Sequence, residues 1–107
     1  MGEYVKIAET KDVLKKQMQV FNAKGQEILV INFGGALFAI ENRCPHMGYP
    51  LFFGSLDGDT LTCGFHSAKF NVKTGKSLGP VTSKPLKTFP VKIQNSSIFI
   101  EVGVLQK

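Results

Sequence analysis

The chain has 107 residues, of which 43% are hydrophobic, 10% aromatic and 20% charged, and its formal net charge is +5. This composition predicts one globular domain over residues 1–107 and argues against disorder. No apolar run reaches the length of about 18 residues that a membrane-spanning helix needs, so we expect no membrane association. The N-terminus has no continuous apolar stretch, which predicts a cytoplasmic protein. Two cysteines are too few for a disulfide scaffold.

The first half of the chain is predicted to form short strands joined by tight turns. No segment keeps a 3.6-residue period over three turns, so long helices are not expected. Gly25 and the pair Gly34-Gly35 stand between apolar segments, where hairpin connections need positive φ. The predicted elements are a strand at 4–8, a turn or single helical turn at 10–16, and strands at 17–21, 26–33 and 36–41.

The second half begins with a break in this pattern. Residues 42–55 hold two prolines and two glycines and are predicted to form a loop. Residues 79–85 carry two more prolines and are predicted to form an ordered loop without strand pairing. Regularly spaced short strands predict an all-β fold, either an antiparallel sandwich or a barrel. The predicted strands are 60–63, 69–72, 88–94 and 97–102, with turns at 57–58, 73–76 and 95–96.

The strong nitrogen and sulfur ligands of the chain all lie in one stretch. The two cysteines and two histidines form the pairs Cys44/His46 and Cys63/His66. In an extended loop, residues two apart point the same way and lie roughly 6–7 Å apart, so one loop could serve two neighbouring metal ions. Two such loops together would offer two thiolates to one ion and two imidazoles to the other, which is the ligand set of a Rieske [2Fe–2S] cluster.

On these residues the sequence resembles the Rieske iron–sulfur proteins. Residues 44–51 are similar to the first cluster loop of that family, with Gly48 two residues after the histidine. Residues 63–75 are similar to the second loop and the hairpin after it, and residues 79–91 to the proline-bearing third loop and the next strand. The resemblance implies a Rieske-type antiparallel β-sandwich with a small cluster-binding subdomain, and one [2Fe–2S] cluster per chain. The cluster ligands that it implies are Cys44, His46, Cys63 and His66.

Several positions depart from the Rieske proteins of bc-type complexes. Tyr49 and Phe65 stand where those proteins carry a disulfide. Ala68 and Phe70 stand where they carry a Ser and a Tyr whose hydroxyls bond to sulfur. Fewer hydrogen bonds to sulfur lower the reduction potential. We therefore expect a midpoint in the lower half of the Rieske range, which spans about −150 to +300 mV.

Other loop residues have weaker assignments. Ser67 replaces a Gly that is common in the family and could restore one hydrogen bond, and Gly64 replaces a common Pro. Met47 is expected to cover the cluster or to pack within the loop. Tight turns are expected at Gly48, Gly64 and Gly79. The candidates for an apolar rim that limits water are Tyr49, Leu51, Phe65 and Pro80, although core packing explains Leu51 and Phe65 equally well.

Two other interpretations of the four residues remain open. The cysteines could be buried apolar thiols and the histidines ordinary loop residues. Alternatively, two Cys and two His could hold zinc, in a zinc-stabilised interaction module without a redox role. Zinc sites usually place two to four residues between the cysteines and three to five between the histidines, whereas here each Cys pairs with a His.

Positive charge is concentrated in the second half. No Asp or Glu occurs between residues 60 and 100, although six lysines do. A cluster of two ferric ions, two sulfides and two thiolates is neutral, and reduction adds one negative charge. A basic face could steer an acidic redox partner, and a solvated lysine surface is an equal interpretation. Nucleic-acid binding is not expected, because only one Arg is present and no zinc-finger, RNP or phosphate-binding motif accompanies the lysines.

The resemblance implies a soluble Rieske-type ferredoxin, a one-electron carrier without substrate turnover of its own. Both histidines are already used, so none is left for the 2-His-1-carboxylate iron site of a ring-hydroxylating oxygenase. The implied electron donor is a flavin-containing NAD(P)H reductase, and the implied acceptor is an oxygenase or another oxidoreductase. We expect a monomer. The alternative is a small Rieske subunit of a multisubunit reductase, such as a nitrite reductase.

Overall fold

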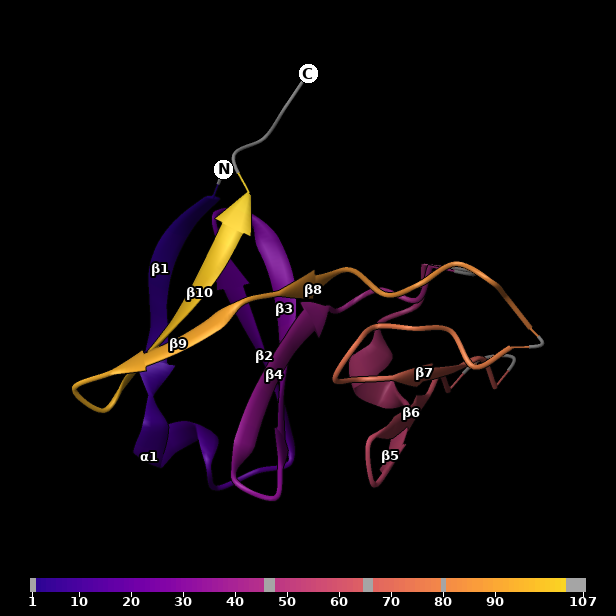
Figure 1. Ribbon diagram of the computed structural model, residues 1–107, viewed down its shortest axis with the longest axis horizontal. Helices are drawn as coiled ribbons and strands as arrows, with labels where there is room; N and C mark the ends of the chain where they lie inside the picture. Colours follow the sequence, from indigo (N-terminus) through magenta and orange to yellow (C-terminus); the bar gives the residue numbers. More distant parts are fainter. Residues whose placement is uncertain (1, 46–47, 65–66, 80, 104–107) are drawn as a thin grey trace.

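The computed structural model describes residues 2–45, 48–64, 67–79 and 81–103, and this part of the chain forms three antiparallel sheets (Figure 1). The first sheet has the order β1-β10-β9. Its strands are β1 (Gly2–Glu9), β10 (Ser97–Gly103) and β9 (Val91–Gln94). One helical turn, α1 (Thr10–Val13), follows β1. The two ends of the described chain therefore pair with each other in one sheet.

The second sheet has the order β2-β3-β4-β8 and lies between the other two (Figure 1). Its strands are β2 (Met18–Ala23), β3 (Gln26–Phe33), β4 (Ala36–Glu41) and the two-residue β8 (Thr88–Phe89). Together with the first sheet it forms a sandwich. This agrees with the predicted all-β antiparallel class, and the predicted strands at 26–33 and 36–41 are confirmed with their boundaries.

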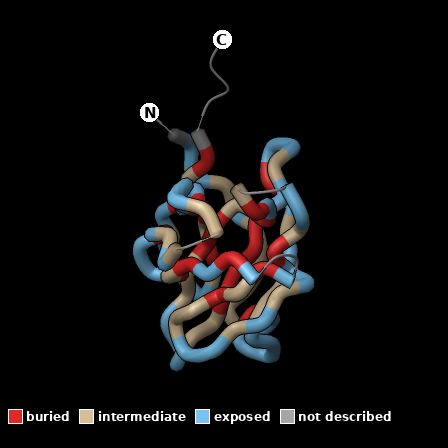
Figure 2. The backbone as a smooth tube through the Cα atoms, turned by 90° about the vertical axis from the view of Figure 1, so that its right-hand side faces the viewer, coloured by how far each residue is buried: buried red, intermediate tan, exposed pale blue. Residues whose placement is uncertain are grey.

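The third sheet belongs to a small subdomain, defined here as residues 42–86. It contains a single 3₁₀ turn, η1 (Leu51–Phe53), and three short strands in the order β5-β6-β7. These strands are β5 (Ser55–Asp57), β6 (Thr60–Thr62) and β7 (Lys69–Asn71). Figure 2 views the molecule from this side, with buried segments through its centre and exposed loops around them.

Two buried cores share the second sheet. Side chains of a strand point alternately to its two faces. In β3, Ile28 and Val30 enter the core between the two sandwich sheets, whereas Leu29 and Ile31 enter the core beneath the small subdomain. All four are at most 1% exposed. A strand that is apolar on both faces is thus buried on both, and this double burial fixes the subdomain against the sandwich.

Three hairpins turn through two-residue connections. The sequence predicts those at residues 34–35 and 95–96, whereas it places the first connection at residues 22–25, and the observed β2 extends to Ala23. Gly34 and Gly35 have φ of 61° and 89°, and Lys24 and Gly25 have φ of 54° and 80°. Positive φ at both positions gives the mirror-image turn that matches strand twist, and glycine adopts it without steric cost. The third connection, at residues 95–96, also has positive φ at both residues, although neither is glycine.

Two predicted segments are wrong, and several predicted strand ends differ from the observed ones by one or two residues. The strand predicted at 88–94 is two strands, because Pro90 has no N–H and the chain changes from the second sheet to the first at that residue. The loop predicted at 42–55 contains η1, and its last residue begins the unpredicted strand β5. The Pro90 carbonyl still accepts a hydrogen bond from the Glu101 N–H at 3.0 Å.

In the described residues, no helix is long and apolar enough to cross a membrane.

Candidate metal centre

Cys44 and Cys63 lie on different loops of the small subdomain and enter the same buried core. Each is 1% exposed. Their shared neighbours include Leu51, Leu61 and Phe70, each with no exposed surface. Neither cysteine forms a disulfide. Two thiols that are 20 or so positions apart in the sequence therefore converge in an apolar environment.

The loop that carries Cys44 closes on itself through backbone hydrogen bonds. The Cys44 N–H donates to the Tyr49 carbonyl at 2.8 Å, and the Gly48 N–H donates to the Cys44 carbonyl at 2.7 Å. Gly48 has a φ of +79°, which confirms the tight turn expected there. Pro45 lies between the cysteine and this turn. The backbone around Cys44 is thus held by its own loop.

The loop that carries Cys63 closes in a similar way. The Cys63 N–H donates to the Ala68 carbonyl at 2.7 Å. Ser67, just before Ala68, has a φ of +59°, a conformation that is disfavoured for a residue with a side chain. A glycine adopts positive φ without steric cost, which explains why a glycine is common at this position in the family that the sequence resembles.

Two glycines hold the two loops close together. A Cβ added at Gly54 would lie 2.1 Å from the Thr62 carbonyl oxygen, and one added at Gly64 would lie 2.9 Å from the Phe53 carbonyl oxygen. Gly64 lies in a turn, as expected, but its φ is not positive, so the close approach rather than backbone conformation is the reason for a glycine there. Gly54 was not singled out from the sequence, because the sequence does not show which atoms lie against the Cα of a loop glycine.

Asn42 connects the first loop to the sandwich. It is 7% exposed. Its side-chain Nδ2 donates to Glu27 Oε1 at 3.2 Å, and its Oδ1 accepts the Phe52 N–H at 2.8 Å. Its backbone N–H donates to the Glu27 carbonyl at 3.0 Å. Asn42 therefore joins both ends of the loop to β3. The sequence reveals only a polar residue after a strand, which is typical of a turn.

The apolar rim differs in part from the expected one. Leu51 has no exposed surface and belongs to the core. Tyr49 is 43% exposed, and Phe53, not predicted, is 75% exposed. These two side chains, with Pro50 and Gly64, line a hollow of about 170 Å³ between the two cysteine loops. Large exposed aromatic side chains beside a candidate site are a typical feature of a contact surface.

Five of the residues singled out from the sequence lie outside the described part of the chain. His46 and His66 are the proposed imidazole ligands, and the structure does not describe their placement. The same holds for Met47, Phe65 and Pro80. Within the described residues, no group of three Cys, His, Asp or Glu side chains could hold a metal ion.

The residues that are described fit an iron–sulfur cluster. Cysteine thiolate is a soft ligand suited to iron–sulfur chemistry, and both thiols face one core that excludes water. Ala68 and Phe70, which carry no side-chain hydroxyl, are 1% and 0% exposed in that same core. These two positions therefore bring no side-chain hydroxyl into that core.

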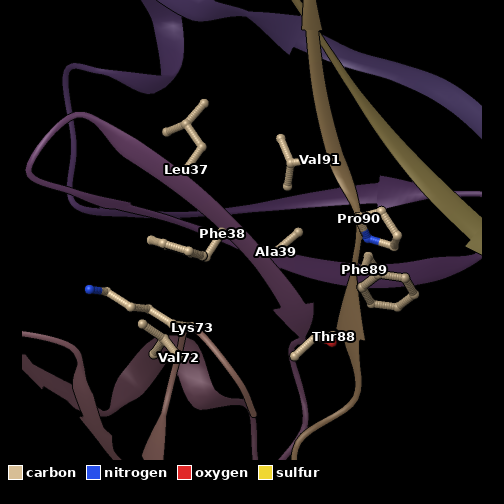
Figure 3. Close-up of a pocket in the computed structure, with 9 residues that line it drawn as sticks. All are labelled: Leu37, Phe38, Ala39, Val72, Lys73, Thr88, Phe89, Pro90 and Val91. Carbon is tan, nitrogen blue, oxygen red and sulfur yellow. The ribbon is translucent and has the colours of Figure 1, made fainter.

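A second hollow, of about 320 Å³, lies where the sandwich meets the small subdomain (Figure 3). It is lined by strand residues such as Leu37, Phe38 and Val91, and by Val72 and Lys73 of the subdomain. Among the described residues that line it, Lys73 is the only charged one. Its described lining is mostly apolar, whereas a typical ligand site brings several polar groups together.

Comparisons with known proteins agree with this geometry. The model of the Rieske [2Fe-2S] domain family matches residues 3–90. The chain is 35% identical over 97 residues to the ferredoxin component of biphenyl 2,3-dioxygenase from Rhodococcus jostii, with 91% of each chain covered. It is 41% identical over 80 residues to the ferredoxin subunit of a 3-phenylpropionate/cinnamic acid dioxygenase from Shigella boydii, with 74% of this chain and 76% of the other covered.

Solved structures show the same fold. One chain in the complex of reduced oxygenase and oxidised ferredoxin of carbazole 1,9a-dioxygenase matches with a TM-score of 0.85 and 27% identity, and 97% of each chain is covered. A ferredoxin from Sphingomonas yanoikuyae matches with a TM-score of 0.84 and 25% identity, over 94% of this chain and 99% of that one. The chain thus belongs to the Rieske [2Fe–2S] family and is an electron carrier of the ferredoxin type with one [2Fe–2S] cluster.

Proposed function

We propose that this carrier holds its cluster through Cys44, His46, Cys63 and His66 and passes single electrons to an oxygenase. The observation that supports the ligand assignment most is the convergence of two buried thiols from two interlocked loops. The relatives named above are ferredoxin components of dioxygenases, and one structural match comes from a complex with the oxygenase. The proposed electron donor is a flavin-containing NAD(P)H reductase.

The protein's own residues provide the environment for electron transfer. When bound, the cluster supplies a reversible one-electron couple. Cys44 and Cys63 anchor it from the buried side, and the surrounding core keeps water from the sulfur atoms. We propose that the two imidazoles face outward, so that an electron leaves towards a docked partner through His46 or His66. Phe53 and Tyr49 line the hollow between the two cysteine loops and would exclude water there when a partner covers them.

We further propose that the chain has no substrate turnover of its own, is one domain over residues 1–107, and acts as a monomer in the cytoplasm. The proposed location is consistent with the two cysteines, because a reducing compartment keeps thiols from forming disulfides.

The decisive experiment is low-temperature EPR of the dithionite-reduced protein, with iron and zinc quantified on the same sample. The proposal predicts a rhombic signal and about two irons per chain. His66→Ala should abolish or change this signal, whereas Ser83→Ala, an exposed control in the same subdomain, should retain it. An unchanged signal in His66→Ala would show that the ligand assignment is wrong. A colourless protein that contains zinc would exclude the redox function.

A further inference from the structure

The charges of the chain are unevenly divided between its two parts. The small subdomain holds five cationic side chains and two carboxylates, and the rest of the chain holds eight cations and six carboxylates. The five cations are all exposed, and they are Arg43, Lys69, Lys73, Lys76 and Lys84. The subdomain is therefore the more positive part of the molecule, although it is the smaller one.

None of the subdomain's cations forms an ion pair with a carboxylate in the described part of the chain, although Arg43 lines a hollow together with Glu27 and Glu41. The two ion pairs found there both lie in the sandwich, between Lys6 Nζ and Glu9 Oε2 at 2.6 Å and between Lys24 Nζ and Glu3 Oε1 at 3.3 Å. Lys73 Nζ lies 5.2 Å from the centre of a Phe ring, a contact that leaves its charge uncompensated. The positive charge of the subdomain's four lysines is thus available to an approaching molecule.

Two of these cations flank the two cysteine loops. Arg43 directly precedes Cys44, and its Nε lies 3.6 Å from the position of a Cβ added at Gly48, so its side chain folds back over the first loop. Lys69 Nζ lies 3.3 Å from Thr62 Oγ1, and Thr62 directly precedes Cys63. One exposed positive charge therefore lies beside each of the loops that carry the cluster ligands.

The two carboxylates of the subdomain gather at a different place. Asp57 and Asp59 flank the turn between β5 and β6. Figure 1 shows this turn at the lower edge of the subdomain, whereas the later part of the chain between β7 and β8 runs along its upper edge. Asp59 also accepts a weak hydrogen bond from Asn71 Nδ2 at 3.4 Å. These carboxylates are thus tied to one hairpin, and within the described residues neither forms an ion pair with a cation of the subdomain.

We propose that the cysteine-loop end of the molecule is a docking surface for a redox partner whose own docking surface is acidic. Phe53 and Tyr49 form its apolar centre, and Arg43 and Lys69 form its cationic flanks. Complementary charge steers the encounter, and the apolar centre supplies the contact that excludes water. The cluster adds at most one negative charge on reduction, so this end stays positive in both redox states. This inference rests on the proposed electron-carrier function.

The test uses one acceptor protein in two charge states. Cytochrome c is basic, and succinylation of its lysines makes the same haem protein acidic. The dithionite-reduced protein, freed of excess reductant, is mixed with each form in a stopped-flow instrument at low and high salt. We expect the acidic form to accept electrons about tenfold faster at low ionic strength. The two rates should converge near 0.5 M salt, where the screening length falls to roughly 4 Å.

Matched variants locate the effect on the surface. The double variant Arg43→Gln/Lys69→Gln should lose most of the preference for the acidic form. The control Lys15→Gln/Lys16→Gln removes the same net charge from exposed residues of the sandwich. This control should retain the preference for the acidic form of cytochrome c. Absorption and EPR spectra of both variants should match those of the original protein, because none of these residues is a proposed ligand.

Each contrary outcome identifies what has failed. Equal rates for both cytochromes at low salt, or the same loss in both double variants, would overturn the cationic docking surface while the cluster remains intact. A protein that shows no reversible cluster signal before mixing would instead contradict the proposed function.

Discussion

Phe70 is the residue whose side chain most directly affects the environment of the two thiols. It has no exposed surface and belongs to the same core as Cys44 and Cys63. The sequence resemblance places a Tyr hydroxyl at this position in bc-type Rieske proteins, where it bonds to sulfur. An aromatic ring without that hydroxyl leaves sulfur with one hydrogen bond fewer, and this stabilises the oxidised cluster relative to the reduced one.

We therefore predict that Phe70→Tyr raises the midpoint potential by roughly 40 mV, the equivalent of one hydrogen bond of about 1 kcal/mol in a one-electron couple. The unaltered protein should itself lie below about +100 mV, in the lower part of the Rieske range. Redox titration followed by EPR measures both values.

The control for this prediction is Phe89→Tyr, which adds the same hydroxyl to the other core, between the sandwich sheets. Its midpoint should not change. A folded Phe70→Tyr protein with an unchanged or lower midpoint would show that hydrogen bonding at this position does not tune the cluster.

Ser67 shows why backbone conformation has to be read together with sequence. From the sequence, its hydroxyl is a possible hydrogen-bond donor to sulfur. The structure shows a positive φ of 59°, at a position where glycine would be unstrained. The backbone conformation at this position thus favours glycine, and the serine side chain is accommodated at some steric cost.

At the scale of elements, the small subdomain depends on the close approach of two loops. Gly54 directly precedes β5 and approaches Thr62 at the end of β6, and a methyl group there would lie 2.1 Å from the Thr62 carbonyl oxygen. Backbone atoms cannot move aside as a flexible side chain can. The spacing between the loops, and with it the spacing of the thiols, thus depends on a missing side chain.

Gly54→Ala is accordingly predicted to destabilise the protein by about 2–3 kcal/mol and to lower the iron content per chain, because it forces the two loops apart. Denaturant unfolding and metal analysis provide the two measurements. Ser55→Ala, an exposed neighbour in β5, should leave both quantities unchanged. A fully loaded Gly54→Ala protein of normal stability would mean that the loops can separate without loss of the site.

At the scale of the whole molecule, the two cores have different relations to the cluster. The core between the sandwich sheets contains neither cysteine, whereas the core beneath the small subdomain contains both. The second sheet borders both cores through the two faces of β3. Loss of the cluster therefore removes a cross-link from one core and leaves the contacts of the other in place.

Removal of the cluster by acid and chelator is thus predicted to increase hydrogen exchange in residues 44–86 while β1, β3 and β10 stay protected. Hydrogen–deuterium exchange measured by mass spectrometry on loaded and cluster-free protein tests this. Comparable loss of protection in β10 would indicate that the two cores unfold as one unit.

The sequence by itself determined the all-β class, the strands at residues 26–33 and 36–41, the hairpin turns, and the two Cys–His pairs that indicate the family. These features are local: alternation of apolar residues, positive φ in short turns, and ligand types at fixed spacing all act over a few residues. The family assignment was therefore available before the tertiary structure.

Only the tertiary structure decided which residues hold the site together. The buried bridge of Asn42, the reciprocal close approaches of Gly54 and Gly64, and the exposure of Phe53 each depend on segments that are distant in the sequence. The change of sheet at Pro90 and the position of Arg43 and Lys69 beside the two cysteine loops have the same origin. Burial and close contact are properties of pairs of segments, and local sequence does not specify which pairs meet.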